Sequence, residues 1–133
     1  MGVYTSNIDV FQTIPKNGET ANNKTLTCGA AGAKGAYTEL IASTAKRVTA
    51  LFLHVRSANV SQVFLVDIAT GAVGSEVVNI SNIQLNKASG SFDSVQYFFL
   101  PIDIASATRV AARASSSLAT DTITIDVVFG EVA

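Results

Sequence analysis

Apolar and polar positions alternate along much of the chain, and this alternation predicts strands rather than helices. In residues 121–129, four large apolar side chains share one face, and threonine and aspartate share the other. Residues 108–115 follow the same pattern, with valine and alanine on one face and Arg109 and Arg113 on the other. A period of two is typical of strands that pack one face against a core. The core-facing residues of the last strand are expected to be Ile123, Ile125, Val127 and Phe129.

The same pattern predicts seven strands from Tyr37 onward and one or two more before it. We therefore expect an all-β fold, an antiparallel β-sandwich of the jelly-roll type with seven to nine strands in two packed sheets. A closed barrel is the alternative. The predicted strands after the first 36 residues cover 37–41, 47–56, 61–70, 75–80, 95–104, 108–115 and 121–129.

Residues 47–70 are the most strongly patterned part of the chain. Two ten-residue runs, 47–56 and 61–70, are rich in β-branched and aromatic residues, and a short polar break separates them. This arrangement predicts a hairpin. Because the second run carries large apolar residues on both faces, the pair is expected in the interior of a sheet and not at its edge.

Two features point to surface positions in the second half of the chain. Residues 81–94 form the longest irregular stretch of the body, and long loops on rigid sheets often carry contacts. Phe92 in this stretch is therefore a candidate interaction residue. In the aromatic run 95–104, where Phe98 shares a face with the aliphatic residues that follow, Pro101 cannot donate a ladder hydrogen bond. This strand is expected at an edge of a sheet, or to change partners at the proline.

The first 36 residues differ from the rest of the chain. An alternating run covers residues 8–14, and a polar, turn-rich segment covers 16–24. We interpret residues 1–36 as an N-terminal arm with one or two edge strands, and residues 37–133 as the sandwich body. The arm side chains expected to contact another protein are Ile8, Val10, Phe11 and Ile14.

Composition favours a subunit of an assembly. The 133 residues fit one domain, only 14% are charged, and 48% are hydrophobic. So little charge suggests that part of the surface meets protein rather than water. The alternative is an ordinary β domain of low charge. The net charge of −1 and the scattered basic residues argue against nucleic acid as a partner. Neither a signal peptide nor an 18-residue apolar stretch is visible, so neither export by a signal peptide nor a membrane partner is expected.

Candidates for chemistry are few. His54 is the one histidine and lies mid-strand, where a structural role is more common than catalysis. Cys28 is the one cysteine and is expected to be a small, partly buried hydrophobic side chain and not a reactive thiol. The glycines of residues 29–35 lack the Lys-Ser/Thr ending of a phosphate-binding loop, so a flexible link or a close approach of two backbones explains them better. We expect no catalytic residue, no metal site and no cofactor.

Arg109 and Arg113 are the remaining candidates for contact with a partner. They lie on one face of a predicted strand, where they could form ion pairs with a carboxylate of a partner across an interface. The alternative is that the pair forms the solvated side of an edge strand.

Three segments in order resemble a group of small virion proteins of tailed bacteriophages. They are Tyr37-Thr-Glu-Leu-Ile-Ala-Ser-Thr, Phe64-Leu-Val-Asp-Ile-Ala-Thr-Gly-Ala-Val-Gly-Ser-Glu-Val-Val and Phe99-Leu-Pro-Ile-Asp-Ile-Ala-Ser-Ala-Thr-Arg-Val-Ala-Ala-Arg. The resemblance spans about residues 37–129. Related sequences tend to have a Pro-Ala-Gly-like turn where this chain has Ala105-Ser-Ala107, which leaves the conformation of that turn open.

This resemblance implies a non-enzymatic capsid decoration (cement) protein, made in the host cytoplasm and placed on the exterior of the virion. Its partner would be the major capsid protein, whose neighbouring subunits it would join, and its own state would be a homotrimer. Two alternatives stay open. One is a tail, baseplate or fibre accessory protein; the other is a carbohydrate-binding β-sandwich that uses Tyr37, Tyr97 and the 81–94 stretch.

Overall fold

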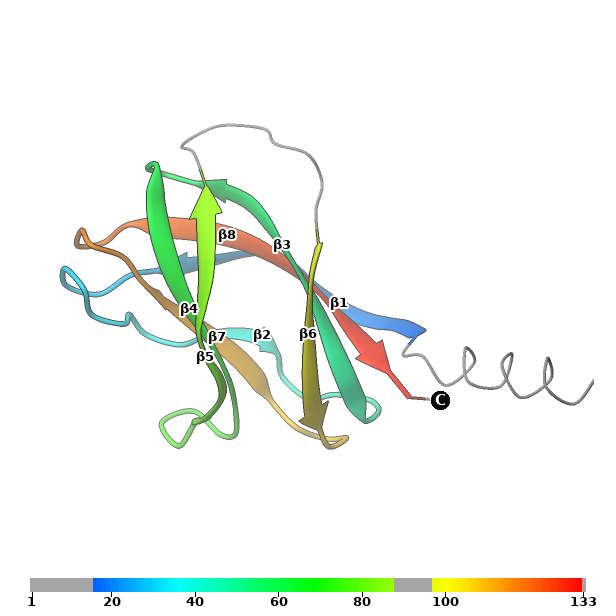
Figure 1. The fold of residues 1–133 in the computed structure, drawn as a ribbon. Helices are drawn as coiled ribbons and strands as arrows, with labels where there is room; N and C mark the ends of the chain where they lie inside the picture. The colour runs from blue at the N-terminus through cyan, green and yellow to red at the C-terminus, as the bar shows by residue number, and fades with distance from the viewer. Residues whose placement is uncertain (1–15, 88–96, 133) are drawn as a thin grey trace, which may run out of the picture.

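Eight strands in two four-stranded antiparallel sheets make up the fold (Figure 1). The computed structural model describes residues 16–87 and 97–132, and these ranges contain no helix. All seven strands predicted from Tyr37 onward are present in the predicted order. The strands are β1 (Lys16–Thr27), β2 (Thr38–Ile41), β3 (Val48–Ala58), β4 (Gln62–Thr70), β5 (Val77–Lys87), β6 (Tyr97–Ile104), β7 (Val110–Ser115) and β8 (Thr122–Glu131).

The strand order confirms the jelly-roll prediction. Sheet A has the order β1-β8-β3-β6, and sheet B has the order β2-β7-β4-β5. The chain passes from one sheet to the other at most connections, which is the winding of a jelly roll, and the two sheets are separate, which excludes the closed barrel. β1 and β6 are the edges of sheet A, and β2 and β5 are the edges of sheet B.

Apolar side chains from both sheets meet in one core. The predicted inward face of β8 is confirmed, because all four of its apolar residues are fully buried. Alternation along β3 works in the same way, with Leu51 and Leu53 buried and Phe52 on the outer face. The largest fully buried side chains are Phe64, Phe129, Leu26, Leu51, Leu53, Ile68, Leu85, Ile104, Ile123, Ile125, Val48 and Val66.

The hairpin predicted over residues 47–70 is wrong, although both of its strands exist. β3 pairs with β6 and β8, whereas β4 pairs with β5 and β7, so residues 59–61 carry the chain from sheet A to sheet B. The expectation that both strands are interior is confirmed, since each has a neighbour on both sides. A short polar break permits either a reversal within a sheet or a crossing between sheets, and the local pattern does not distinguish the two.

Two segments predicted as irregular belong to edge strands. The polar segment 16–24 lies within β1, which pairs with β8 and is held to the core by Ala21 and Leu26. Residues 81–87 belong to β5. Both edge strands contain an irregularity at an asparagine with positive φ, Asn23 at 55° and Asn82 at 56°. These bulges interrupt the alternation of apolar residues, which is why the sequence pattern did not show the strands.

β6 lies where the proline predicted it. It is the edge strand of sheet A, and its register with β3 shifts close to the pair Ala50 and Pro101. The prediction that this strand lies at an edge is therefore confirmed. Within the described residues, this edge position leaves one side of β6 without a hydrogen-bonded neighbour.

The glycine-rich segment 28–37 connects β1 with β2 and packs closely on sheet B. The Gly35 N–H donates to the Ala114 carbonyl oxygen at 2.9 Å, and a Cβ on Gly35 would overlap the carbonyl oxygen of Thr27. The close backbone approach expected of these glycines is confirmed at this position. The segment also carries Lys34 over the outer face of sheet B, as described below.

Candidate interaction surfaces

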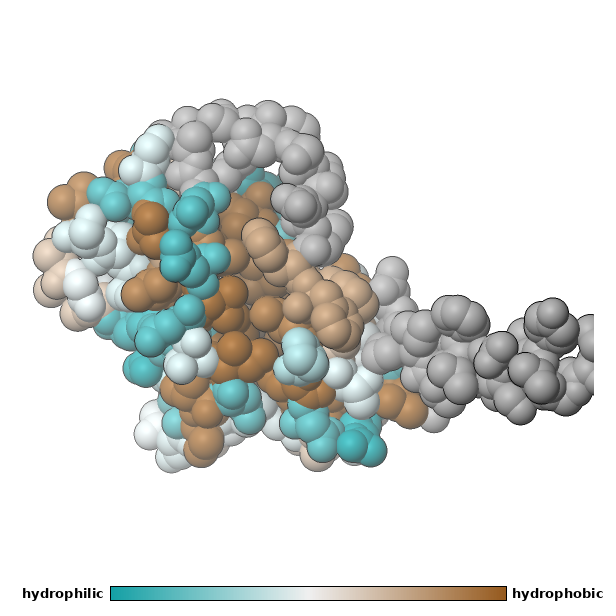
Figure 2. Space-filling view, viewed as in Figure 1, coloured by the Kyte–Doolittle hydropathy of each residue, from teal (hydrophilic) through white to brown (hydrophobic). Residues whose placement is uncertain are grey.

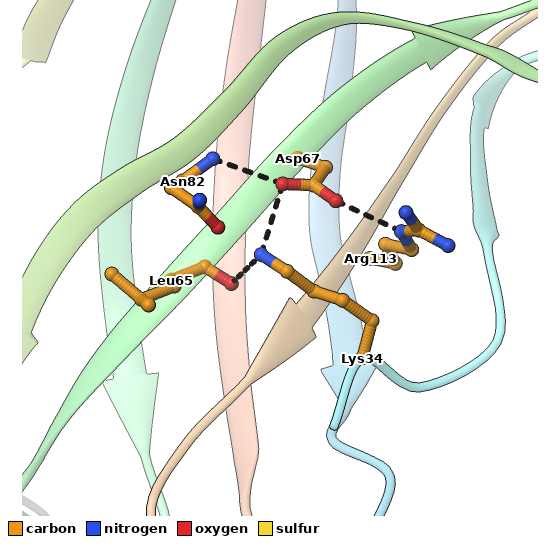
Figure 3. Close-up of polar contacts among 5 residues, drawn as sticks. All are labelled: Lys34, Leu65, Asp67, Asn82 and Arg113. Atoms are coloured by element: carbon orange, nitrogen blue, oxygen red, sulfur yellow. Dashed lines mark hydrogen bonds and ion pairs between the residues drawn. The ribbon is translucent and has the colours of Figure 1, made fainter. Parts of the chain in front are cut away.

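A buried carboxylate organises the outer face of sheet B (Figure 3). Asp67 on β4 lies between two core residues and therefore points to the opposite face, yet its side chain is only 4% exposed. Its Oδ1 accepts hydrogen bonds from Lys34 Nζ and from the Asn82 N–H, both at 2.9 Å. Its Oδ2 accepts one from Arg113 Nε at 2.9 Å. Lys34 Nζ also donates to the Leu65 carbonyl oxygen at 2.9 Å. These residues form the Asp67 cluster.

The outer face of sheet A carries a comparable Asp126 cluster. Asp126 on β8 is buried, and the Asn23 N–H donates to its Oδ1 at 2.8 Å. Arg56 Nε on β3 donates to Oδ2 at 3.1 Å, and His54 Nδ1 lies 3.2 Å from the same oxygen. His54 thus has a structural contact with Asp126 on the sheet surface, as the sequence predicted.

The two clusters occupy equivalent positions in the two sheets. In each, an edge strand supplies the N–H of a positive-φ asparagine, the next strand supplies the aspartate, and the third supplies an arginine. In each sheet, a hydrogen bond therefore links the bulge of the edge strand to an aspartate of the neighbouring interior strand. The matching residues are Asn23 with Asn82, Asp126 with Asp67, and Arg56 with Arg113.

The surroundings of both aspartates lower their pKa. Burial by itself raises the pKa of Asp67, but hydrogen bonds from Lys34, the Asn82 N–H and Arg113 outweigh it and bring the pKa below the ordinary 3.8. Burial raises the pKa of Asp126 in the same way, and the hydrogen bonds from the Asn23 N–H, Arg56 and His54 lower it overall.

These shifts predict how stability depends on pH. A carboxyl whose pKa is lower in the folded than in the unfolded chain stabilises the fold above the unfolded pKa, and this stabilisation disappears as the pH falls through the folded pKa. We expect the free energy of unfolding to decrease below about pH 4. Urea titrations between neutral pH and pH 3 measure this, and the decrease should be smaller in Asp126→Asn. An equal decrease in that variant would contradict the assignment to Asp126.

Arg109 also has partners within the chain. Its Nε donates to Glu39 at 2.9 Å, and its Nη1 donates to Glu76 at 3.0 Å and to the Gly71 carbonyl oxygen at 3.1 Å. The Arg113 guanidinium, besides Asp67, lies 4.7 Å from the centre of the Tyr37 ring. β7 lies between β2 and β4 and is therefore an interior strand. This excludes the alternative in which the two arginines lie on the solvated side of an edge strand. That they contact a partner stays a prediction.

The other predicted contact residues, Ile8, Val10, Phe11, Ile14 and Phe92, lie outside the described residues. The same holds for residues 1–15 of the predicted arm. The described part of that arm consists of edge strand β1 and the connection to β2.

Exposed aromatic side chains gather on β6. Phe98 is 42% exposed and Phe99 is 59% exposed, although both are large and apolar. Phe99 pairs with Phe52 across the outer face of sheet A, with ring centres 5.5 Å apart. Phe98 lies on the inner face opposite the buried Leu53. The sequence pattern placed Phe98 on one face with the aliphatic residues that follow it, but it did not show that Phe98 would be partly exposed there.

Most of the side chains considered for catalysis or ligand binding are buried or make contacts within the fold. Cys28 is buried, more completely than the partial burial predicted, and burial raises the pKa of its thiol. Within residues 16–87 and 97–132, no group of three or more His, Cys, Asp and Glu side chains is placed to hold a metal ion. The Tyr37 ring considered for sugar stacking has one face occupied by Arg113. A small pocket of about 210 Å³ is lined by Gly32, Val63, Leu65, Ser115, Ser116 and Ser117.

Fold and surfaces together define an eight-stranded jelly-roll sandwich with a buried aspartate cluster on each outer face and an exposed aromatic edge strand. Comparison with protein-family models finds no match, and comparison with curated proteins finds none either. A chain of the solved structure described as "Structure of infectious bursal disease virus Gx strain" aligns with a TM-score of 0.41 and 11% identity. The alignment covers 90% of this chain and 37% of that chain. In the described residues, no helix has the length and apolar character needed to cross a membrane.

Proposed function

We propose that this protein is a non-enzymatic structural subunit of a tailed-bacteriophage virion. In this proposal it decorates the capsid exterior as a homotrimer and stabilises the shell by binding across neighbouring major capsid protein subunits. The proposal is supported by the three-segment resemblance over residues 37–129 and by the surface of the sandwich.

The aromatic pair on the outer face of sheet A, exposed Phe99 and half-buried Phe52, carries the proposal. Phe99 is 59% exposed and contacts Phe52, and both lie on an outer face where a monomer in water would favour polar side chains. Aromatic residues are enriched in the centres of protein interfaces, whereas charged residues are depleted there. The two phenylalanines are therefore the residues we assign to the capsid contact.

Internal pairing of charges supports the same assignment. In the Asp67 and Asp126 clusters, an arginine forms an ion pair with the aspartate, and Arg109 forms ion pairs with Glu39 and Glu76. Because these charges already have partners, a protein that covers the sheet does not need to supply new ones. Three equivalent contacts in one trimer then reinforce one another by avidity, even when each is weak.

Binding to capsids tests the proposal. We expect the purified protein to bind undecorated, expanded capsids of the source phage, with density on the outer surface in cryo-electron microscopy. Phe99→Ser should weaken this binding by at least about tenfold through loss of an aromatic contact. Val73→Ser is the matched control, because Val73 is 77% exposed but lies in the turn between β4 and β5.

Two results would overturn the proposal. One is the absence of binding by the unaltered protein to such capsids. The other is immunogold labelling of intact virions that is confined to the tail, which would favour a tail accessory protein instead. If Phe99→Ser and Val73→Ser weakened capsid binding equally, Phe99 would not be part of the capsid contact.

A further inference from the structure

In the part of the chain that the structure describes, the sandwich is open on the side where edge strands β5 and β6 face each other. Figure 2 shows apolar surface between these strands, bordered by polar side chains over β5. On the opposite side the edges meet, since Thr38 Oγ1 on β2 donates to the Thr25 carbonyl oxygen on β1 at 3.4 Å. We call this side the β5–β6 opening. Its apolar lining consists of Ile80, Ile83, Leu100 and Ile102, which are only partly buried, and Phe98, which is 42% exposed.

The backbone edge and the apolar side chains of this opening are suited to bind an extended segment of polypeptide. Among residues 16–87 and 97–132, no strand pairs with the outer edge of β6, and its core-facing side chains are only partly buried. A strand added beside β6 would satisfy the free backbone groups and would insert every second side chain over the core. The occupant therefore needs apolar residues with a period of two over about the length of β6, which has eight residues.

Residues 8–14 have this pattern at three of the four positions on one face. In Ile8-Asp-Val-Phe-Gln-Thr-Ile14, three apolar side chains at alternate positions, Ile8, Val10 and Ile14, share one face with Gln12. The opposite face carries Asp9, Phe11 and Thr13. Seven residues match the length of β6, and the described chain begins just after them at Lys16.

The segment cannot reach the opening of its own chain. Lys16 pairs with Glu131, Glu131 with Val48, and Val48 with Ile104. The start of β1 is therefore three strand spacings, about 14 Å, from the end of β6. A strand added outside β6 lies at about 19 Å. The two residues that lead from Ile14 to Lys16 span at most about 7 Å.

We propose that residues 8–14 of one copy add as a strand to β6 in the β5–β6 opening of a second copy. The face with Ile8, Val10 and Ile14 packs against Phe98 and the partly buried aliphatic residues. Such a contact joins different surfaces of the two copies, so successive copies are linked head to tail, and a closed ring of three gives the expected homotrimer. This self-association goes beyond capsid binding, and it is tested in solution without capsids.

Cysteine trapping tests which surfaces meet. In a Cys28→Ala background, a Val10→Cys protein is mixed with a Phe98→Cys protein and oxidised. We expect a disulfide-linked pair that contains one copy of each. Phe99→Cys is the matched control, since it lies on the same strand but on the opposite face, and it should give little product. Equal trapping at positions 98 and 99, or no trapping at 98, would overturn the proposal.

Association of the full chain gives a second readout. Light scattering over a concentration series should show oligomers, and Ile8→Ser with Val10→Ser and Ile14→Ser should raise the dissociation constant at least about tenfold. Phe11→Ser is the control from the opposite face of the segment and should leave the constant nearly unchanged. A full-length chain that stays monomeric at the highest concentration would overturn the proposal, as would equal effects of the two variants. A monomeric chain would also contradict the homotrimer of the proposed function, whereas capsid binding by the outer face of sheet A is tested separately with capsids.

Discussion

Asp67→Ala should lower the free energy of unfolding by about 3 kcal/mol. The alanine removes the carboxylate that accepts hydrogen bonds from Lys34, Arg113 and the Asn82 N–H, and it leaves two cations close together on a covered face. Breaking a buried ion pair by deleting one partner is costly for this reason. Equilibrium urea denaturation followed by tyrosine fluorescence or circular dichroism measures the change.

Asp103→Ala is the matched control for this prediction. Asp103 also pairs with an arginine, since Arg47 Nε donates to it at 2.8 Å, but both side chains are more than half exposed. Water screens such a pair, so its loss should leave the unfolding midpoint nearly unchanged. If the two variants shifted the midpoint equally, burial of the Asp67 cluster would not be the source of its stabilisation.

Gly35→Ala should destabilise the fold by about 3 kcal/mol or more. The added Cβ would overlap the carbonyl oxygen of Thr27, a backbone atom that cannot rotate away. Relief requires the chain at Gly35 to move away from the end of β1, and this shift would disturb the hydrogen bond from Gly35 to Ala114 and the position of the neighbouring Lys34 in the Asp67 cluster. Thermal or urea unfolding of the variant tests this expectation.

Gly32→Ala separates a steric effect from a general effect of glycine replacement. Gly32 lies in the same connection with φ of +77°, but a Cβ there would meet open space. Its replacement should therefore cost only the left-handed backbone strain, about 1 kcal/mol. A Gly32→Ala variant as unstable as Gly35→Ala would show that contact with Thr27 is not the cause.

The candidate surfaces were only partly predictable. The alternation around Arg109 and Arg113 correctly placed both arginines on one outer face, and Pro101 correctly placed its strand at an edge. The ion partners of the arginines come from distant parts of the chain, such as Asp67 for Arg113. No spacing in the sequence relates these residues, because strand order decides which of them become neighbours.

The sequence by itself determined the strands whose apolar faces alternate without interruption, and with them the all-β class and most of the core. Burial of one face has a local cause, since a period of two puts alternate side chains on the same side. Only the tertiary structure decided that residues 59–61 cross between the sheets and that β-bulges form at Asn23 and Asn82. It also decided that the apolar side chains along β5 and β6 stay only partly buried in the described part of the chain. Each of these depends on which strands lie side by side, and that choice is made by contacts between residues far apart in the chain.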